Sequence, residues 1–333
     1  MRWRLDPMAA QGSDTTMSDD EFPAEDAFVA EVCWHYYVNE MTQAEIAKFL
    51  GATRLRVNQA IQKARAQGMV RIQIESPAMP YFDLQDRLRD RFGLDRVLVA
   101  PARPDAYDFN RPVGAALASY MQDRLRAGDW RRIGVSWGMT LQASIDRMPR
   151  QSWPDVEIIS IIGGTSRGET FNSFGIASGF AERLGARYSL LAAPIFLADR
   201  VQRDAFLAQD IFQTHFAKFA TLDAAILTCS DISAASYLIS SGLPAGVSKS
   251  SLTGDGAIGD VVCRFLDGQG RAVCPRLDER TIGISLDLLR QVPDRVLAAA
   301  GPHKVDIIRV IVGQGIANSL ITDDVTARLL LDG

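Results

Sequence analysis

Four glycine-containing segments of the sequence carry side chains suited to binding an anion or a polyhydroxylated molecule. They are WGMT (137–140), GGTSRGETFN (163–172), GDGAIGD (254–260) and GPHK (301–304). Glycine lets backbone N–H groups converge on a ligand, and the partial positive charge of a helix N-terminus attracts anions. Thr140, Arg167 and Lys304 would add hydroxyl and cationic donors, while Asn172 and Asp260 would hold sugar hydroxyls.

No enzyme motif accompanies these segments. The sequence lacks GxSxG, a P-loop and HExxH, and no GxGxxG follows the first expected strand. Its three histidines exclude a His-rich metal site, and its four cysteines lie far apart without a CxxC pair, as reduced thiols do. His303 beside Lys304 would in principle suit an isomerase, but contact with a ligand or a helix cap is the favoured interpretation. We therefore expect no catalytic residue, no metal and no cofactor.

A second set of polar side chains is suited to contact DNA. Arginine pairs with guanine, and asparagine or glutamine pairs with adenine, each good bidentate contact adding roughly 1–3 kcal/mol of discrimination. The segment TRLRVNQ (53–59) places such residues at the start of an expected helix. The candidate DNA contacts are Thr42, Gln43, Thr53, Arg54, Arg56, Asn58, Gln59, Lys63 and Arg71.

Three short helices and a strand would position these DNA contacts. The first helix covers about residues 25–38, with apolar residues at intervals of four. Thr42 and Glu45 have the spacing of a capping box at the start of the second helix, and Thr53 is an N-cap for the third. Apolar and polar residues then alternate over 70–76, as in a half-exposed strand. This order is typical of a winged helix-turn-helix; a three-helix packing unit without a nucleic acid partner is the alternative.

The charge of the chain is unevenly distributed. The 333 residues carry a net charge of −4, which argues against binding polyanions over the whole surface. Residues 1–30 carry −5, whereas residues 31–76 carry +2, so a small basic island coincides with the expected helix-turn-helix. A chance excess of bases on a solvated face is the other interpretation of that island.

Length and composition favour a soluble protein of two domains. The chain is 47% hydrophobic and 23% charged, with neither a run of about 18 apolar residues nor a signal peptide, so we expect a cytoplasmic protein without a membrane partner. Residues 1–24 would form a flexible acidic tail and 25–76 the winged helix-turn-helix domain. Residues 77–93 would form a linker helix that packs either on its copy in a dimer or on its own chain. Residues 94–333 would form the effector domain.

The second domain alternates apolar strands with amphipathic helices. Strands are expected at 96–100, 132–136 and 156–162, and further candidates include 281–285 and 295–300. This alternation predicts an α/β fold in which a parallel sheet is covered on both faces. Such sheets bind ligands at the carboxyl ends of their strands. A single glycine turn can serve loop geometry alone, but four at one sheet edge favour a phosphorylated or polyhydroxylated ligand.

These residues resemble the SorC-type family of sugar-responsive bacterial transcription regulators. In the N-terminal part the resemblance rests on TQAEIA (42–47), on Arg54 with Val57, and on GMVRI (68–72). In the larger part its motifs are IGVSWGMTL (133–141), Gly163 with Gly164, GDGAIGD (254–260), AAGPHK (299–304) and NSLITDD (318–324). The sequence looks most similar to the subgroup that regulates erythritol catabolism.

The resemblance implies an effector domain with the fold of sugar-phosphate isomerases and deaminases but without their activity. It also implies dimers or tetramers on DNA. Gly138, Met139 and Thr140 correspond to a phosphate-binding loop of the family, and Gly163 with Gly164 lines the same pocket. Asp260 matches an acidic position that contacts the sugar, and Lys304 matches a phosphate-binding lysine.

Two departures from the family pattern bear on partners. Gln59 stands where the family's reading helix often has a second arginine, so the operator is expected to differ. Ile162 stands where an arginine often precedes the two glycines, and Arg167 follows them instead, which leaves an unphosphorylated polyol as an alternative effector. Together with the motifs, the resemblance implies a DNA-binding regulator, expected to be a repressor, of a sugar or polyol operon that is controlled by a phosphorylated sugar or polyol. An isomerase or deaminase with an appended DNA-binding module is the alternative.

Overall fold

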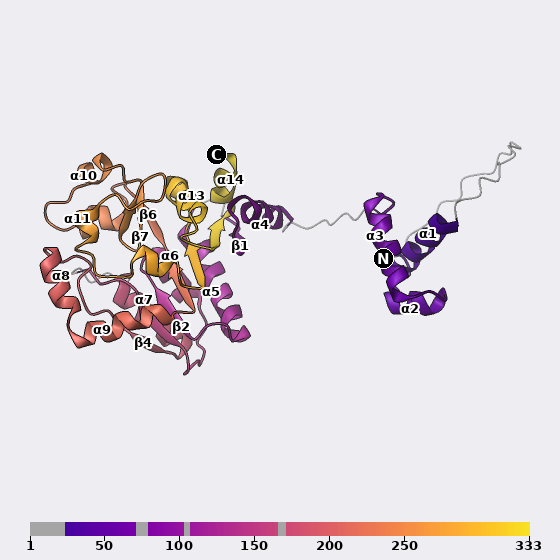
Figure 1. Cartoon of the computed structure of the whole chain (residues 1–333), viewed down its shortest axis with the longest axis horizontal. Coiled ribbons are helices and arrows are strands. Elements are labelled where there is room, and N and C mark those ends of the chain that lie inside the picture. The colour runs from indigo at the N-terminus through magenta and orange to yellow at the C-terminus, as the bar shows by residue number, and fades with distance from the viewer. Residues whose placement is uncertain (1–23, 71–78, 103–106, 166–170) are drawn as a thin grey trace, which may run out of the picture. The chain divides into compact units, whose positions relative to one another are not determined.

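The computed structural model describes residues 24–70, 79–102, 107–165 and 171–333. The chain divides into two compact units, an N-terminal unit of residues 1–75 and a C-terminal unit of residues 76–333 (Figure 1). Within the described ranges, no helix is long and apolar enough to cross a membrane.

The N-terminal unit is built from the three expected helices. They are α1 (Ala24–Tyr37), α2 (Gln43–Phe49) and α3 (Arg54–Ala66). Val32, Ile46 and Val57 are fully buried where the three helices meet. Because one apolar side chain from each helix contributes to this core, the helices stabilise one another.

Helix caps fix the connection between α2 and α3. The Thr42 hydroxyl accepts a hydrogen bond from the Glu45 backbone N–H, and the Glu45 carboxylate accepts one from the Thr42 N–H, which is the predicted capping box. Gly51, in the turn, has a φ of +62°, a conformation that favours glycine. Thr53 caps α3 by accepting a bond from the Arg56 N–H. The expected wing continues beyond residue 70, and that part of it, which includes Arg71, lies outside the described residues.

The C-terminal unit is centred on a seven-stranded parallel sheet in the order β1-β10-β9-β5-β2-β3-β4. Its strands are β1 (Arg96–Ala100), β2 (Arg132–Val135), β3 (Glu157–Ser160), β4 (Arg187–Ser189), β5 (Ala224–Leu227), β9 (Asp294–Ala298) and β10 (Ser319–Asp323). The predicted parallel α/β fold is therefore confirmed.

Helices cover both faces of this sheet. One face packs against α5 (Asn110–Ala127), α6 (Met139–Arg147) and α7 (Ser173–Leu184). The other packs against α4 (Met79–Phe92), α9 (Asp210–Ala217), α13 (Val305–Gly313) and α14 (Asp324–Asp332). Along β5, Ala224 and Ile226 belong to the first core and Ala225 and Leu227 to the second, which explains why the strand is apolar throughout. The helix expected as a linker is α4, which packs on its own unit through Leu84 and Leu88.

A small antiparallel sheet stands beside the large one. It consists of β6 (Cys229–Asp231), β7 (Gly259–Val261) and β8 (Arg264–Leu266). The C-terminal unit also contains the short helices α8 (Arg200–Leu207), α10 (Lys249–Gly254), α11 (Pro275–Asp278) and α12 (Leu286–Leu289), with single turns at 218–221, 238–242 and 302–304.

Three details differ from the sequence-based expectation. GDGAIGD is not a strand-end loop, because its last residues pair as β7 with β6 and β8. TIGIS (281–285) makes only isolated bridges, through Thr281 and Gly283, and no regular strand. Conversely, NSLITDD contains a central strand, β10, which was not expected; it pairs with β1 and β9 on either side.

The strand order creates a reversal point in the sheet. From β2 the chain continues to β3 and β4 on one side, whereas β5, β9 and β10 lie on the other side of β2. In open parallel sheets, ligands bind outside the carboxyl ends of the strands at such a reversal. The site is therefore sought in the segments that follow β2 and β5.

Candidate functional site

A cavity of about 420 Å³ lies at the carboxyl ends of β2 and β5. Its walls come from four segments of the C-terminal unit and from three further residues. They are the segments Phe109–Asn110, Ser136–Thr140 and Thr228–Leu238 in large part, and His303–Lys304, with Phe171, Asp260 and Val262. The volume is in the range of pockets that bind small molecules.

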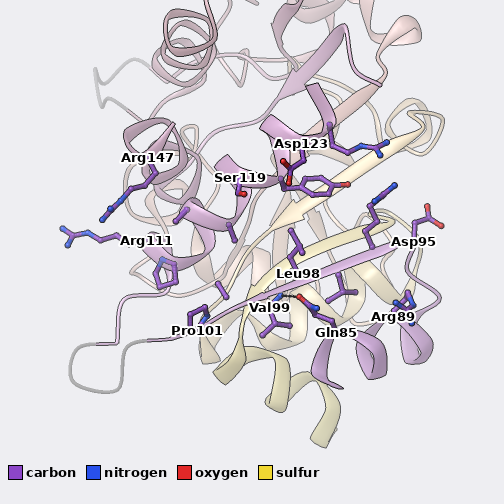
Figure 2. Close-up of a pocket in the computed structure, with 18 of the residues that line it drawn as sticks. Gln85, Arg89, Asp95, Leu98, Val99, Pro101, Arg111, Ser119, Asp123 and Arg147 are labelled. Carbon is purple, nitrogen blue, oxygen red and sulfur yellow. Dashed lines mark hydrogen bonds between the residues drawn. The ribbon is translucent and has the colours of Figure 1, made fainter. Parts of the chain in front are cut away.

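A larger hollow of about 1250 Å³ runs along the edge strand β1, between α4 and α5. Figure 2 shows Leu98 of β1 on its floor, with Ser119 and Asp123 of α5 on one side and Gln85 of α4 on the other. The Gln85 side chain accepts a 3.0 Å hydrogen bond from the Val99 N–H, so it occupies part of the free edge of β1. This hollow lies at the side of the sheet and not at the carboxyl ends, so the smaller cavity is the candidate effector site.

The start of α6 forms one wall of the cavity. Gly138 has a φ of +133°, and a Cβ there would lie 3.1 Å from the Thr228 hydroxyl, so the position requires glycine. No side chain of a described residue caps α6, which leaves its first backbone N–H groups to a ligand. Thr140 is buried and donates a 2.8 Å hydrogen bond to Asn110, which joins this wall to the start of α5.

Lys304 supplies a cation to the same cavity. Its ammonium lies 5.3 Å from the centre of the Phe109 ring, and no described carboxylate lies within 4.0 Å of it. His303 packs edge-on against the Phe109 ring, at 5.1 Å between ring centres. Burial lowers the pKa of His303, and the charge of Lys304 lowers it further. Both effects favour the neutral imidazole, and Lys304 supplies the positive charge of this wall.

Asp260 is the buried acid of the site. It is 5% exposed, and its carboxylate accepts hydrogen bonds from the Ser230 hydroxyl and, at 3.2 Å, from the Cys263 N–H. Ser236 in turn donates to Ser230 at 3.0 Å. Burial raises the pKa of the Asp260 carboxyl to about 6, although these hydrogen bonds and the charge of Lys304 act to lower it. A carboxylate held in this way is a hydrogen-bond acceptor for hydroxyl groups.

Three aromatic rings form the remaining wall. Tyr237 packs edge-on against Trp137 at 5.4 Å and against Phe171 at 5.2 Å between ring centres. The Tyr237 hydroxyl is buried and has no hydrogen-bond partner among the described residues. An unpaired buried hydroxyl costs free energy, so this group is suited to bond a ligand that enters the cavity.

The structure brings together five of the predicted effector residues. Gly138, Met139, Thr140, Asp260 and Lys304 all line the cavity.

Three other predicted effector residues do not line it. Gly163 and Gly164 instead donate backbone hydrogen bonds to Ile282 and Ala193, and a Cβ on either would clash. Asn172 caps α7 through bonds from the N–H groups of residues 174 and 175, so its side chain is not directed to a ligand. Arg167 lies outside the described residues.

Several cavity residues were not expected from the sequence. Ser230 and Asp231 lie in β6, which is separated from the end of β5 by one residue, so the rule that ligands bind at strand ends would have found them. Phe109 and Asn110 begin a helix without a glycine-rich turn, and Tyr237 lies in a serine-rich connection. Neither segment carries a signal in the sequence.

In the N-terminal unit, α3 presents the candidate nucleic-acid contacts. Arg54 and Gln59 are exposed, and Thr53 is exposed at the N-terminus of the helix. Gln43 of α2 donates a 3.5 Å hydrogen bond to Asn58, which ties these two predicted residues to each other. The exposed side chains of α3 therefore offer amide and guanidinium groups on one helix.

Two predicted DNA contacts are held by α1 instead. The Arg56 guanidinium lies 4.4 Å from the centre of the Phe28 ring, and the Lys63 ammonium forms a 3.2 Å salt bridge with Asp26. Their side chains thus have partners inside the unit. Because they remain at least partly exposed, they can contact a phosphate at the edge of the helix, but Arg54 is the freer of the two arginines.

Comparison with known proteins places these units in a family. Residues 76–332 match the family model described as "Putative sugar-binding domain". The erythritol catabolism regulatory protein EryD of Brucella abortus (strain 2308) is 30% identical over 312 residues, which cover 92% of this chain and 97% of EryD. The sorbitol operon regulator of Klebsiella pneumoniae is 28% identical over 309 residues, covering 91% and 97% of the two chains. The crystal structure of full-length SorC from Klebsiella pneumoniae aligns with a TM-score of 0.70 at 26% identity, over 93% of this chain and 100% of that one.

A parallel α/β unit with a cavity at its reversal point, in a chain similar over its length to these proteins, defines a sugar-binding transcriptional regulator. The chain belongs to the SorC-type family of such regulators, as the sequence resemblance predicted. Since its relatives are transcriptional regulators of sugar or polyol operons, the chain is a regulator and not an enzyme.

Proposed function

We propose that this protein is a cytoplasmic repressor of a sugar or polyol catabolic operon whose affinity for operator DNA is controlled by a phosphorylated sugar or polyol. The observation that carries the effector assignment is Lys304, a cation without a described salt-bridge partner, in a cavity that also receives the uncapped start of α6. A phosphate would satisfy both the ammonium and the helix N–H groups.

The rest of the cavity suits the carbohydrate portion of the effector. Asp260 and the hydroxyls of Ser230 and Ser236 offer acceptors and donors for sugar hydroxyls. Trp137 and Tyr237 offer apolar surface for the carbon skeleton. This division into a cationic end, a hydroxyl-binding side and an aromatic wall supports a phosphorylated carbohydrate over a simple inorganic anion.

The N-terminal unit would bind the operator through α3 as a helix-turn-helix. Thr42, Gln43, Thr53, Arg54, Asn58 and Gln59 would contact the DNA, with Arg56 and Lys63 at the edge of the interface and Arg71 on the expected wing. Two half-sites one helical turn apart require two reading helices related by symmetry, so the functional species would be a dimer or tetramer. Sedimentation at micromolar concentration tests this: a mass equal to the 36.5 kDa chain would count against it.

Isothermal titration and DNA binding together test the proposed function. A panel of sugar and polyol phosphates, with the unphosphorylated forms as controls, is titrated into the full chain, and a gel shift uses the intergenic DNA upstream of its gene. We expect one phosphorylated compound to bind and to release the DNA. Tight binding of only unphosphorylated polyols would overturn the proposal that the effector is phosphorylated. Absence of a gel shift would overturn the proposal that the protein binds an operator in this DNA.

A further inference from the structure

Leu55 is a large apolar side chain on the exposed surface of α3. It lies in the first turn of α3 and is 66% exposed, although burial out of water would stabilise an apolar side chain. No other large apolar residue of α3 is exposed. Neighbouring residues, Arg54 and Arg56, are polar, as expected of a solvated helix surface. The exposed leucine is therefore available to a partner outside the unit.

The position of Leu55 on the helix points it away from the core. Val57, Ile61 and Ala64 form the buried side of α3, with exposures of 0%, 2% and 0%. At 100° per residue, Leu55 and Gln59 lie opposite that side and one turn apart. In a helix-turn-helix, the outward face at the N-terminal end of the second helix is the part that meets base edges in the major groove.

Base edges offer one apolar group in the major groove, the C5-methyl of thymine. The glutamine amide, in contrast, pairs with N6 and N7 of adenine. Four residues of helix rise about 6 Å, and stacked base pairs are about 3.4 Å apart, so Leu55 and Gln59 would reach base pairs within two steps of each other.

We propose that Leu55 is a specificity-determining residue that reads a thymine methyl group in each operator half-site, beside an A·T pair whose adenine is read by Gln59. This inference rests on the proposed DNA binding and adds the base that the reading helix selects. It also gives Leu55 a role, contact with a methyl group, that none of the polar candidate residues has.

Thymine-to-uracil substitution tests the contact, because uracil lacks only the methyl group. Duplexes are first selected from a random-sequence library by the full-length protein. Each thymine of the selected site is then replaced by uracil, and the dissociation constant is measured for the original chain and for Leu55→Ala. We expect one thymine per half-site at which uracil weakens binding about fourfold, the equivalent of ~0.8 kcal/mol for one buried methyl. At that thymine, Leu55→Ala should bind the two duplexes equally.

Two variants serve as controls. Val38→Ala removes a 55% exposed apolar side chain of the same unit outside α3, and it should retain the full uracil effect. Leu55→Met keeps an apolar side chain and should restore part of the effect. Equal sensitivity of the original chain and Leu55→Ala to every uracil would overturn the proposal, even with tight operator binding. Failure to select any sequence would overturn the proposed DNA binding itself.

Discussion

The Lys304 ammonium lies 5.3 Å from the centre of the Phe109 ring. Lys304 ends the single turn that follows β9, and Phe109 immediately precedes α5, so the contact joins these two segments. A cation over an aromatic face is attracted by the ring while remaining free to bind an anion. The contact therefore holds a charge at the cavity without neutralising it.

Lys304→Ala should weaken binding of a phosphorylated effector about 10–150-fold, since a charge-assisted hydrogen bond contributes roughly 1.5–3 kcal/mol. Isothermal titration measures the loss, and operator binding should be unchanged. Lys304→Arg, which keeps the charge, should recover much of the affinity. Equal affinity of Lys304→Ala and the original chain would remove Lys304 from the site.

Tyr237→Phe should separate ligand binding from folding. The Tyr237 hydroxyl is buried without a described partner, so its removal should leave the melting temperature unchanged or raised. If the hydroxyl bonds the effector, affinity should fall about 2–10-fold, as for one neutral hydrogen bond. A lower melting temperature with unchanged effector affinity would mean that the hydroxyl has a structural partner instead.

Arg54→Ala should weaken operator binding more than Arg56→Ala does. Arg54 is free to pair with guanine, a contact that discriminates by roughly 1–3 kcal/mol, whereas Arg56 stacks on Phe28. Arg56→Ala should instead lower the stability of the N-terminal unit slightly, by about 0.5–1 kcal/mol for an exposed cation–π contact. Footprinting and thermal unfolding measure the two effects. Unchanged operator affinity in both variants would show that α3 is not the reading helix.

Asp260 should make the stability of the C-terminal unit depend on pH. Its pKa is about 6 in the native state, raised from the ordinary value of 3.8 by burial. The unfolded chain therefore loses this proton at a lower pH than the native state does. As a result, the free energy of unfolding decreases as the pH rises from about 4 to about 6. Above pH 6 the decrease stays constant, at roughly 3 kcal/mol.

Comparison with Asp260→Asn isolates this contribution, because asparagine does not titrate. Denaturant unfolding at pH 4 and pH 7 should show the variant gaining stability relative to the original chain between the two values. Any hydrogen bond lost on substitution shifts both values equally. A stability difference that is the same at both pH values would mean that Asp260 titrates normally in the native state.

Local patterns in the sequence were sufficient to predict most elements. Thr42 with Glu45, and the buried periodicity of α3, predicted the N-terminal helices because caps and amphipathic faces act over a few residues. The apolar sequences of β2 and β3 predicted a parallel sheet, because this pattern also extends over only a few residues. Strand β10 was not expected, because its single stretch of apolar residues follows α13 closely and its pairing with β1 depends on residues more than 200 positions away.

The site was only partly predictable, since it depends on tertiary arrangement. Gly138 and Lys304 were found because glycine turns before helices are visible in the sequence. Gly163 has the same appearance, yet its glycine allows close approach to the backbone of residues 193 and 194. Asp260 was expected in a loop but reaches the cavity from β7, and Tyr237 comes from a connection without a pattern. Only the fold decides which glycines face a ligand.

The coupling between effector and operator is the central claim, and fluorescence anisotropy of one labelled operator duplex measures it directly. The full-length chain is titrated into the duplex with and without the phosphorylated sugar or polyol that binds the cavity. A coupling free energy of about 1–3 kcal/mol predicts a 5–150-fold rise in the operator dissociation constant, which Lys304→Ala should abolish. An operator dissociation constant that stays the same at saturating effector would contradict the account.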